Sequence, residues 1–539
     1  MTKPLRPRRW LALRKDEPFP VWLIFPVIFV ALYVTHADLL RLPYWWDEAG
    51  YYIPAAWDFF RTGSLIPIST LSNAHPPLPS IYLALWWKLS GFDPEVTREA
   101  VLVVASLGLL AVWRLALRLT GSGLAAFWTV VLTGLYPIWF AQSTLAHADI
   151  FAAACTLWGL VYALPERDRN PRAAMLWFMA AALSKETAIA VPATLALLAA
   201  WRGVRGAAQE RGAAWREAAW LATSVLPLAG WYAWHYAKTG FVFGNPEFLR
   251  YNAEATLTPV RVLAAFGHRV LHLTAHMNLF VPVLMTFAAL LLTPRKEADG
   301  RVRGTIDGGA RVRIFALLAA NAVLFSVLGG ALLTRYLLPM YPLVLVLAVA
   351  TFRRRVPQWH ALAAFCAAAF VVGLFVNPPY GFAPEDNLEY ARVIRMQMAG
   401  MAQLNRFGHS TTVLTAWPVT DDLTRPELGY VKVPWKVYRV EDFTAAAMDA
   451  AAQAEGKYGV ALVFSTKYDP PPLIRLGGSQ SLDEEYFGLH HDLPPEKIAA
   501  RLSGTIVWQR ADHGMWAAVI GFNRPVQAAQ SGAGAARGR

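Results

Sequence analysis

Long apolar runs recur along the first 376 residues, and they constrain the fold of this chain more than any other feature. They lie near residues 19–35, 100–119, 122–141, 147–164, 173–184, 187–201, 218–236, 276–293, 314–333, 336–352 and 358–376. Inside lipid every backbone polar group needs an internal partner, which a helix provides. Composition agrees, because 56% of residues are hydrophobic and 16% charged, against about 45–50% and 25% in soluble domains. The chain is predicted to be mainly α, a polytopic membrane protein of about 11 transmembrane helices.

Basic residues gather in every second connection between these runs. The N-terminal flank is basic, and so are the connections near residues 114–118, 167–172, 202–216, 295–313 and 353–355. Cytoplasmic loops carry such an excess of Lys and Arg, so the net charge of +13 is read as topology rather than as nucleic-acid binding. The N-terminus is therefore expected in the cytoplasm and the C-terminus outside.

The remaining segments divide the chain into three parts. Residues 77–91 are apolar but short for a span. Counting them as a span would move every later loop to the opposite side of the membrane and place the basic loops outside. They are therefore predicted to form an interfacial or re-entrant helix in the first outer segment, residues 37–99. Residues 1–376 are predicted as the membrane domain. Residues 377–526 are predicted as a small α/β or α+β domain outside the membrane, with strands at TTVLTAW and GVALVFS and a helix at AAAMDAAAQAE. Residues 527–539 are predicted to be disordered.

An acidic pair, Asp47 and Glu48, stands among aromatic residues in the first outer segment. Trp46, Tyr51 and Tyr52 flank it; His75-Pro76-Pro77-Leu78 follows. Aromatic faces stack on sugar rings and carboxylates accept hydroxyl protons, which favours a sugar site. The alternative is an interfacial belt, where Trp and Tyr gather for other reasons.

Three further polar features lie at ends of apolar runs that the topology places on the same outer side. Asp149 begins the fourth run, and is either functional or a helix acid favoured by the macrodipole. Lys185 precedes Glu186 between two runs, and either pairs with that acid or binds a lipid phosphate. Arg335, followed by Tyr336, is either a snorkelling arginine or a phosphate clamp. Together they describe a site that holds an anion and deprotonates a hydroxyl.

With these residues the sequence resembles the GT-C membrane glycosyltransferases, in particular the protein O-mannosyltransferases and bacterial aminoarabinose transferases. The resemblance runs over residues 19–376 and rests on five motifs in order: Asp47-Glu48, His75-Pro76-Pro77-Leu78, Asp149, Ser184-Lys185 and Arg335-Tyr336-Leu337-Leu338-Pro339. It implies an inverting transferase that moves a sugar from a polyprenyl monophosphate to an acceptor glycan, lipid or protein. It also implies a bacterial inner-membrane enzyme working on the outer face.

The resemblance implies a role for each matching residue. Asp47 is the general base, Asp149 orients acceptor or sugar, and Glu48 supports Asp47. Lys185, Arg335 and His75 stabilise the leaving phosphate, with Tyr336 as hydrogen-bond donor, and Trp46, Tyr51 and Tyr52 bind the sugar or acceptor. Many relatives carry Lys at the place of His75, which puts its phosphate role in question.

A divalent metal stays an open alternative, and no cofactor is assigned. His75 with Glu48 or His147 is one candidate ligand set; His268, His272 and His276, spaced four residues apart, are another. Two other functions also stay open. One is a transporter or flippase for lipid-linked saccharides, although no inverted repeat is visible; the other is a polymerase or ligase that uses pyrophosphate-linked glycans.

Overall fold

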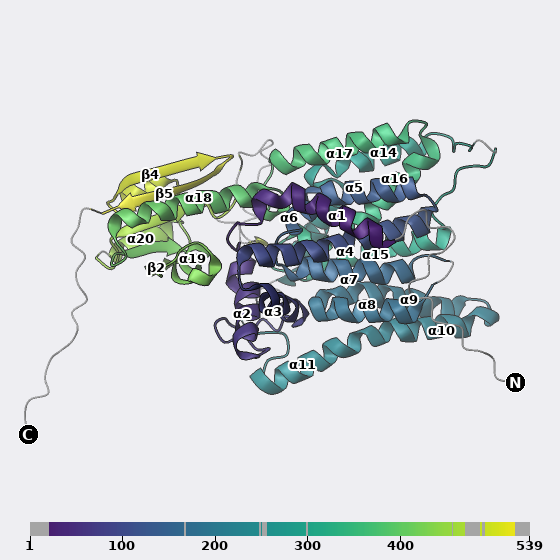
Figure 1. The fold of residues 1–539 in the computed structure, drawn as a ribbon, viewed down its shortest axis with the longest axis horizontal. Coiled ribbons are helices and arrows are strands. Elements are labelled where there is room, and N and C mark those ends of the chain that lie inside the picture. The colour runs from purple at the N-terminus through teal and green to yellow at the C-terminus, as the bar shows by residue number, and fades with distance from the viewer. Residues whose placement is uncertain are drawn as a thin grey trace, which may run out of the picture.

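The computed structural model describes residues 21–166, 169–246, 250, 256–297, 300–454, 456–468, 470, 486–487 and 491–522. The basic N-terminal flank and the tail at 527–539 lie outside the described residues. Most of the chain is helical (Figure 1). The bundle contains α1 (Val21–His36), α4 (Pro94–Thr120), α5 (Gly123–Leu135), α6 (Pro137–Gln142), α7 (Ala148–Ala163), α8 (Pro171–Ser184), α9 (Ala190–Arg205), α10 (Ala208–Ala222), α11 (Leu226–Thr239), α13 (Pro259–Thr274), α14 (Phe280–Leu290), α15 (Gly308–Val327), α16 (Tyr341–Arg355) and α17 (Trp359–Phe375).

Local sequence signals set several helix ends. Asp93 caps α4 by accepting a hydrogen bond from the Glu95 backbone, and Pro94 fills the first turn, where no donor is needed. Gly121 ends the same helix in the left-handed conformation, with a φ of 64°. Ser122 and Asp307 cap α5 and α15 in the same way as Asp93. The bundle helices are therefore bounded by the residues that such ends require.

The helices cover the predicted apolar runs, but several runs are broken. Among the described residues three helices are long and apolar enough to cross a membrane, at Pro94–Thr120, Glu186–Arg205 and Gly308–Val327. A fourth crossing is reached if Pro259–Asn278 and Phe280–Leu290, bent by 97°, count as one span. The run at 218–236 is split by the turn η4 (Thr223–Val225). The number of eleven crossings and the orientation of the chain therefore stay predictions.

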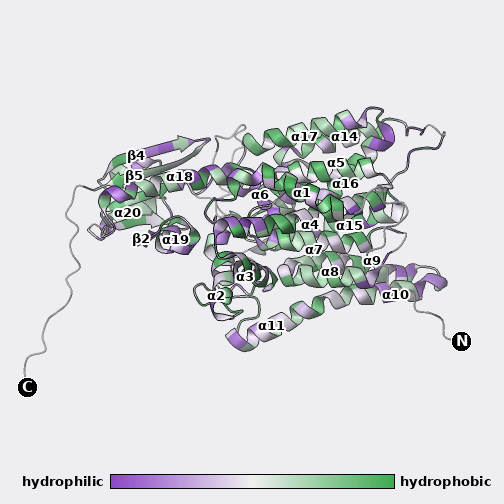
Figure 2. Ribbon diagram, viewed as in Figure 1, coloured by the Kyte–Doolittle hydropathy of each residue, from purple (hydrophilic) through white to green (hydrophobic). Residues whose placement is uncertain are grey.

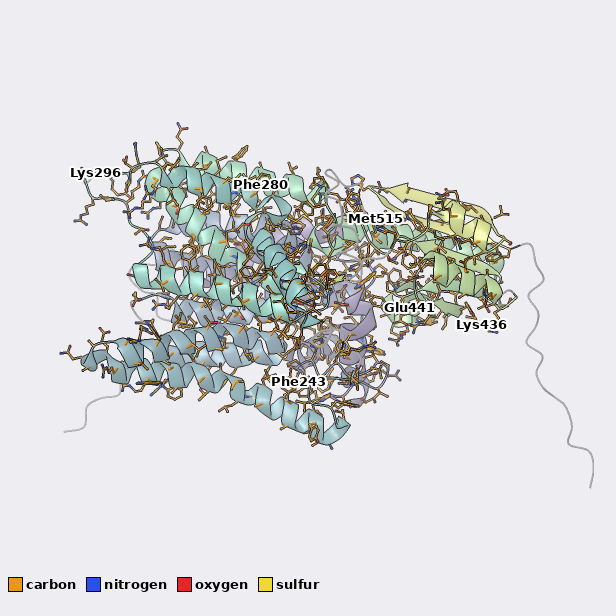
Figure 3. All side chains as sticks on the ribbon, turned by 180° about the vertical axis from the view of Figure 1, so that it is seen from behind. Phe243, Phe280, Lys296, Lys436, Glu441 and Met515 are labelled. Atoms are coloured by element: carbon orange, nitrogen blue, oxygen red, sulfur yellow. The ribbon has the colours of Figure 1, made fainter. Side chains whose placement is uncertain are left out.

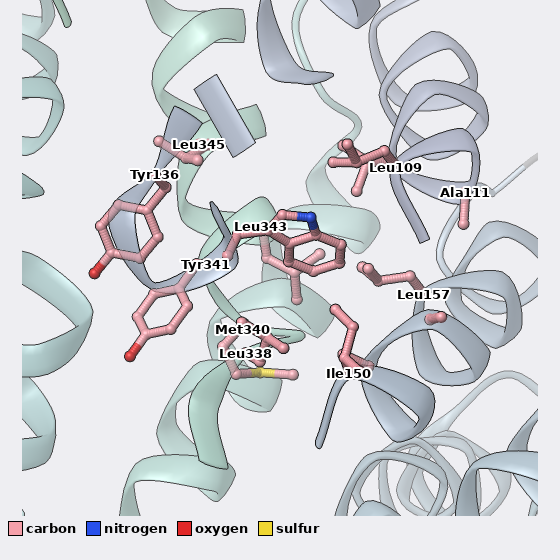
Figure 4. Close-up of a cluster of buried hydrophobic side chains, with 14 of the residues drawn as sticks. Leu109, Ala111, Tyr136, Ile150, Leu157, Leu338, Met340, Tyr341, Leu343 and Leu345 are labelled. Carbon is pink, nitrogen blue, oxygen red and sulfur yellow. The ribbon is translucent and has the colours of Figure 1, made fainter. Parts of the chain in front are cut away.

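The bundle core consists of apolar side chains from helices that are distant in sequence. Leu109, Ile150 and Leu157 of α4 and α7 meet residues of α16 (Figure 4). Tyr136 and Tyr341 lie side by side, with ring centroids 4.8 Å apart. Figure 2 shows the helices predominantly green, with purple concentrated at their ends and in the C-terminal region. Apolar area facing both core and surroundings is the pattern expected of a bundle in lipid.

The connection between α1 and α4 is folded into a helical layer. It holds the π-helical turn η2 (Glu48–Tyr52), α2 (Ile53–Thr62) and α3 (Leu78–Ser90). The predicted short helix at 77–91 is confirmed as α3, which packs against α2, α4 and α8. Trp87 of α3 is 1% exposed and donates a hydrogen bond to Thr97, so this helix is part of the packed structure.

A mixed sheet forms the C-terminal region. Its strand order is β2 (Lys436–Val440), β1 (Thr412–Ala416), β3 (Val460–Phe464), β5 (Met515–Gly521), β4 (Thr505–Asp512), with β1 parallel to β2 and β3 and with β5 antiparallel to both neighbours. The helices of this region are α18 (Glu389–Leu404), α19 (Val419–Thr424), α20 (Ala445–Gln453) and α22 (Pro495–Arg501). The predicted strands at TTVLTAW and GVALVFS and the predicted helix at AAAMDAAAQAE are confirmed as β1, β3 and α20. The domain boundary at 376 stays a prediction.

The sheet lies at one end of the bundle (Figure 1). Lys296, between α14 and α15, lies at the opposite end from Lys436 and Glu441 of the sheet region (Figure 3). The carboxyl end of β1 leads to Trp417, whose ring contacts that of Trp46 at 4.7 Å. Beyond the carboxyl end of β3, Tyr468 contacts Phe382 at 4.9 Å. The sheet thus presents its carboxyl ends to the bundle, on the side where the predicted site residues lie.

Candidate active site

Asp47 begins the η2 turn between α1 and α2. The residue before it, Trp46, has a φ of 47°, a left-handed conformation that is uncommon for a bulky side chain. Asp47 keeps 35% of its side chain exposed, more than the groups it contacts. Strained backbone of this kind costs of order 1–3 kcal/mol and gathers at functional sites. Asp47 is thus held rigidly with an accessible carboxylate.

Arg335, in the turn η7 (Thr334–Leu337), is the centre of the site. Its guanidinium donates hydrogen bonds to the carboxylates of Asp47 and Glu385, and its Nε lies 3.3 Å from Asp149 Oδ2. The arginine is 2% exposed. Asp47 and Arg335 are 288 residues apart in sequence, so the fold brings these predicted site residues together.

Lys185 lies at the break between α8 and η3 (Glu186–Ile189). Its ammonium donates a 2.6 Å hydrogen bond to Asp149 Oδ1 and sits 4.2 Å from the centre of the Tyr336 ring. The expected alternative, pairing of Lys185 with Glu186, is wrong, because Asp149 at the start of α7 reaches the ammonium instead. Tyr336 contacts Lys185 with its ring face, a cation–π contact, in place of the expected hydroxyl. Asp149 therefore binds both cations of the site.

His75 lies in a second polar group beside this cluster. It shares a 3.1 Å hydrogen bond with Glu186 Oε2, and its ring lies 5.2 Å from Tyr51 and 5.7 Å from Tyr52. Ala74 before it has a φ of 57°, so a strained residue precedes His75 as one precedes Asp47. The predicted aromatic residues Tyr51 and Tyr52 thus surround His75, while Trp46 lies against Trp417.

Glu48 does not face the same space as Asp47. It is fully buried and accepts hydrogen bonds from the backbone of Trp45 at 2.9 Å and Ala146 at 2.6 Å. Both oxygens also pair with Arg98, itself fully buried, at 3.4 and 3.3 Å. These contacts fix the η2 turn to α4 and to the start of α7. The structure gives Glu48 a positioning place, and its pairing with His75 as a metal ligand stays a prediction.

The second candidate set of metal ligands lies on α13 and on the turn η6 (His276–Asn278) that follows it. His268, His272 and His276 follow one another with ring centroids 6.3 and 5.2 Å apart. His276 bonds Asp386 at 2.9 Å and Tyr380 at 3.0 Å. Within the described part of the chain, no group of three or more His, Cys, Asp or Glu is arranged to hold a metal ion.

Three contributors to the site come from the region after α17 and were not among the predicted residues. Glu385 and Asp386, in the turn η8 (Pro384–Asp386), bind Arg335 and Thr334. Burial raises the pKa of Glu385 to about 8, even though Arg335 acts to lower it. Trp417 packs on Trp46 and on Gly50. Glu385-Asp386 is an acidic pair that follows an apolar run, as Asp47-Glu48 is, and this shared feature is a sequence signal that could have found it.

Comparison with known proteins gives a family match and a fold. Residues 74–231 match the model of the dolichyl-phosphate-mannose-protein mannosyltransferase family, a stretch that includes His75, Asp149 and Lys185. No curated protein sequence matches the chain. Among solved structures the chain is similar to ArnT from Cupriavidus metallidurans in the apo state, with 13% identity, 92% of this chain and 97% of that chain covered, and a TM-score of 0.51.

The same protein bound to undecaprenyl phosphate is similar over the same shares of both chains, 92% and 97%, with 16% identity and a TM-score of 0.50. The chain has an ArnT-like fold. The resemblance to the group of O-mannosyltransferases and aminoarabinose transferases is thereby confirmed.

Proposed function

We propose that this chain is an inverting glycosyltransferase that moves a sugar from a polyprenyl-phosphate donor to an acceptor hydroxyl. The observation that carries the proposal is the contact of Asp47, Asp149, Lys185 and Arg335 at one end of the bundle. A partly exposed carboxylate beside two buried cations suits a base next to a phosphate. A similar fold that binds undecaprenyl phosphate supports this class of donor.

Asp47 is the general base. The acceptor oxygen attacks the anomeric carbon as its proton passes to the Asp47 carboxylate, and the bond between that carbon and the phosphate oxygen breaks. The electron pair leaves with the polyprenyl phosphate, so no general acid is needed. Base catalysis of this kind contributes about 10²–10⁴-fold. Asp47 suits the role because its carboxylate is the accessible acid of the cluster.

Lys185 and Arg335 stabilise the charge that grows on the leaving phosphate. Arginine presents a planar fork that matches phosphate oxygens, and fixed charges in a dry site are worth several kcal/mol of the barrier. Asp149 orients both cations, since it contacts each of them. Tyr336 holds the Lys185 ammonium in place through its ring face. His75 adds a polar side chain beside the two cations, and Glu48 holds the η2 turn.

The acceptor approaches Asp47 from the side of the sheet. Trp46 and Trp417 offer partly exposed aromatic rings beside the base, and Tyr51 and Tyr52 line the opposite part of η2. The chain accordingly divides into a membrane domain, residues 1–376, and a periplasmic domain, residues 377–526. The reaction takes place on the outer face of a bacterial inner membrane.

The test is sugar transfer by purified protein in lipid nanodiscs, with native mass spectrometry to identify the lipid that copurifies. A polyprenyl monophosphate carrying one sugar identifies the donor, and its loss of that sugar to an acceptor measures activity. Asp47→Asn should abolish transfer while lipid binding persists. Asp38→Asn, an exposed acid of the same connection, is the matched control and should be silent.

The same experiment separates the alternatives. A copurifying pyrophosphate-linked oligosaccharide points to a polymerase or ligase. With the protein in sealed vesicles instead of nanodiscs, movement of lipid-linked sugar across the bilayer without any new glycosidic bond points to a transporter. Full transfer activity in Asp47→Asn would contradict the proposed base.

A further inference from the structure

The charges that meet at Arg335 do not cancel. Arg335 contacts Asp47, Asp149 and Glu385, and Lys185 contacts Asp149. When all three acids are ionised, these five side chains carry three negative and two positive charges. A site meant for a phosphate, itself an anion, would be expected to carry an excess of positive charge.

The two terminal nitrogens of the Arg335 guanidinium each donate to a carboxylate, and its Nε lies 3.3 Å from Asp149 Oδ2. A donor phosphate gains a two-pronged contact with this arginine when one of the acids withdraws. Asp149 is a poor candidate, because it also holds Lys185. Asp47 must stay to receive the proton from the acceptor.

Glu385 is the acid left to withdraw. Among the described residues, its side chain pairs with Arg335 and with no other cation. We propose, on the basis of the proposed function, that the Glu385 carboxyl group occupies Arg335 in the empty enzyme and yields this arginine to the donor phosphate. It is a positioning residue that acts through Arg335.

The turn that carries Glu385 is anchored independently of this side chain. Asp386 bonds Thr334 and His276, and the backbone oxygen of Glu385 accepts a hydrogen bond from Gln142 at 3.5 Å. The carboxylate of Glu385 can therefore rotate away while η8 keeps its place. Because η8 joins α17 to α18, the exchange occurs at the junction between bundle and sheet.

The electrostatic surroundings favour release of Glu385 as a neutral acid. The groups that act on it are one cation, Arg335, and three acids, Asp47, Asp386 and Asp149. Burial and these acids outweigh the arginine and raise the pKa of Glu385 to about 8. An incoming phosphate adds negative charge and raises the pKa further, so donor binding is coupled to proton uptake.

The experiment measures the affinity of the full-length protein for undecaprenyl phosphate without sugar, at pH 7 and pH 9. Both the wild type and Glu385→Gln are titrated in detergent micelles by thermophoresis. Glu389→Gln is the matched control, since Glu389 is also buried and belongs to the same junction but bonds Asn377 rather than Arg335. The second ionisation of a phosphate monoester lies near pH 6, so the lipid keeps its charge across this window.

The expected result is tighter binding by Glu385→Gln, about 5- to 30-fold at pH 9 and less at pH 7. The wild type and Glu389→Gln should both bind less tightly at pH 9 than at pH 7. The wild-type series tests the exchange even if Glu385→Gln does not fold, because an affinity that stays constant from pH 7 to pH 9 would overturn it.

Two other outcomes separate this inference from the proposed function. If the wild type binds but Glu385→Gln binds equally or less tightly at pH 9, Glu385 merely holds Arg335 in place and the inference fails while the donor site stands. If the wild type does not bind undecaprenyl phosphate at either pH, the donor site fails and the exchange fails with it.

Discussion

Asp47 and Glu48 are adjacent in sequence, yet they belong to opposite kinds of buried ion cluster. Glu48 and Arg98 form a closed pair, with one charge of each sign and every remaining carboxylate contact made by backbone donors. Asp47 joins a cluster in which three acids share Arg335 and Lys185. The first cluster is balanced and shut off from solvent; the second is unbalanced and open at Asp47.

This difference separates scaffold from chemistry. A satisfied buried pair resists change, because removal of either partner strands a charge away from water. In an unbalanced cluster the repulsion between like charges shifts the pKa values of its members, which is typical of functional sites. Glu48 and Arg98 hold the η2 turn in the conformation that presents Asp47, so the balanced cluster keeps the unbalanced one in place.

The largest expected effect is on turnover, from Asp47→Asn. Loss of the base should lower the transfer rate by about 10²–10⁴-fold. The melting temperature should stay the same or rise, because one of three mutually repelling acids becomes neutral. Rates in nanodiscs and thermal unfolding in detergent measure the two effects. If Asp47→Asn lowered the melting temperature as much as a substitution of Arg98 does, the two ion clusters would not differ in their contribution to stability.

Arg98→Met should destabilise the protein by about 3–5 kcal/mol, since it leaves the Glu48 carboxylate buried without its cation. Denaturant unfolding in micelles gives the free energy. The double variant Arg98→Met with Glu48→Gln should recover much of the loss, because no charge is then stranded. A double variant no more stable than the single one would show that Arg98 acts mainly through its hydrogen bonds to the Leu42, Pro43 and Thr144 carbonyls.

The unbalanced cluster should also make stability depend on pH. The pKa of Glu385 is raised to about 8 in the folded protein, above the value near 4.3 of an unfolded chain. The folded state therefore binds the proton more tightly, and this contribution to stability is present at low pH and is lost as the pH rises toward 8. Melting temperatures from pH 5 to pH 9 should fall by roughly a few degrees in the wild type. Glu385→Gln should flatten the curve, whereas a variant at Glu389 that flattened it equally would point to another group.

The smallest effect is expected at the aromatic contact between bundle and sheet. A Cβ added at Gly50 would lie 2.9 Å from Cζ2 of Trp417, so Gly50→Ala must shift that ring away from Trp46. Such overpacking costs about 1 kcal/mol or somewhat more, and KM for the acceptor should rise about 3- to 10-fold while donor affinity is unchanged. Gly230→Ala, where an added Cβ meets open space, is the control. Equal kinetics of the two variants would remove Trp417 from the acceptor side.

Features that depend on residue type and on the spacing of apolar residues could be predicted from the sequence. Contacts between residues that are distant in sequence could not be predicted, because they depend on how the helices pack. Apolar runs and alternating strands predicted the bundle helices, β1 and β3, because burial follows those periods. Asp149, Lys185 and Arg335 were predicted because charges at the ends of apolar runs are costly, and Asp47 because it belongs to an acidic pair among aromatic residues. The pairing of Lys185 with Asp149 rather than its neighbour Glu186 was missed, since it depends on how α7 and α8 pack. The break at Met277, with a φ of 48°, carries no sequence signal.

The position of Glu385 has a consequence for anyone who recombines this protein with its relatives. The acid belongs to the first turn after α17, so it travels with whichever parent supplies that turn. A chimera joined between Phe375 and Pro384 would import a foreign group opposite Arg335 and reset the affinity for the donor. A chimera joined after Asp386, in the short link before α18, would exchange the sheet and the proposed acceptor surface while leaving the native contact between Glu385 and Arg335 intact.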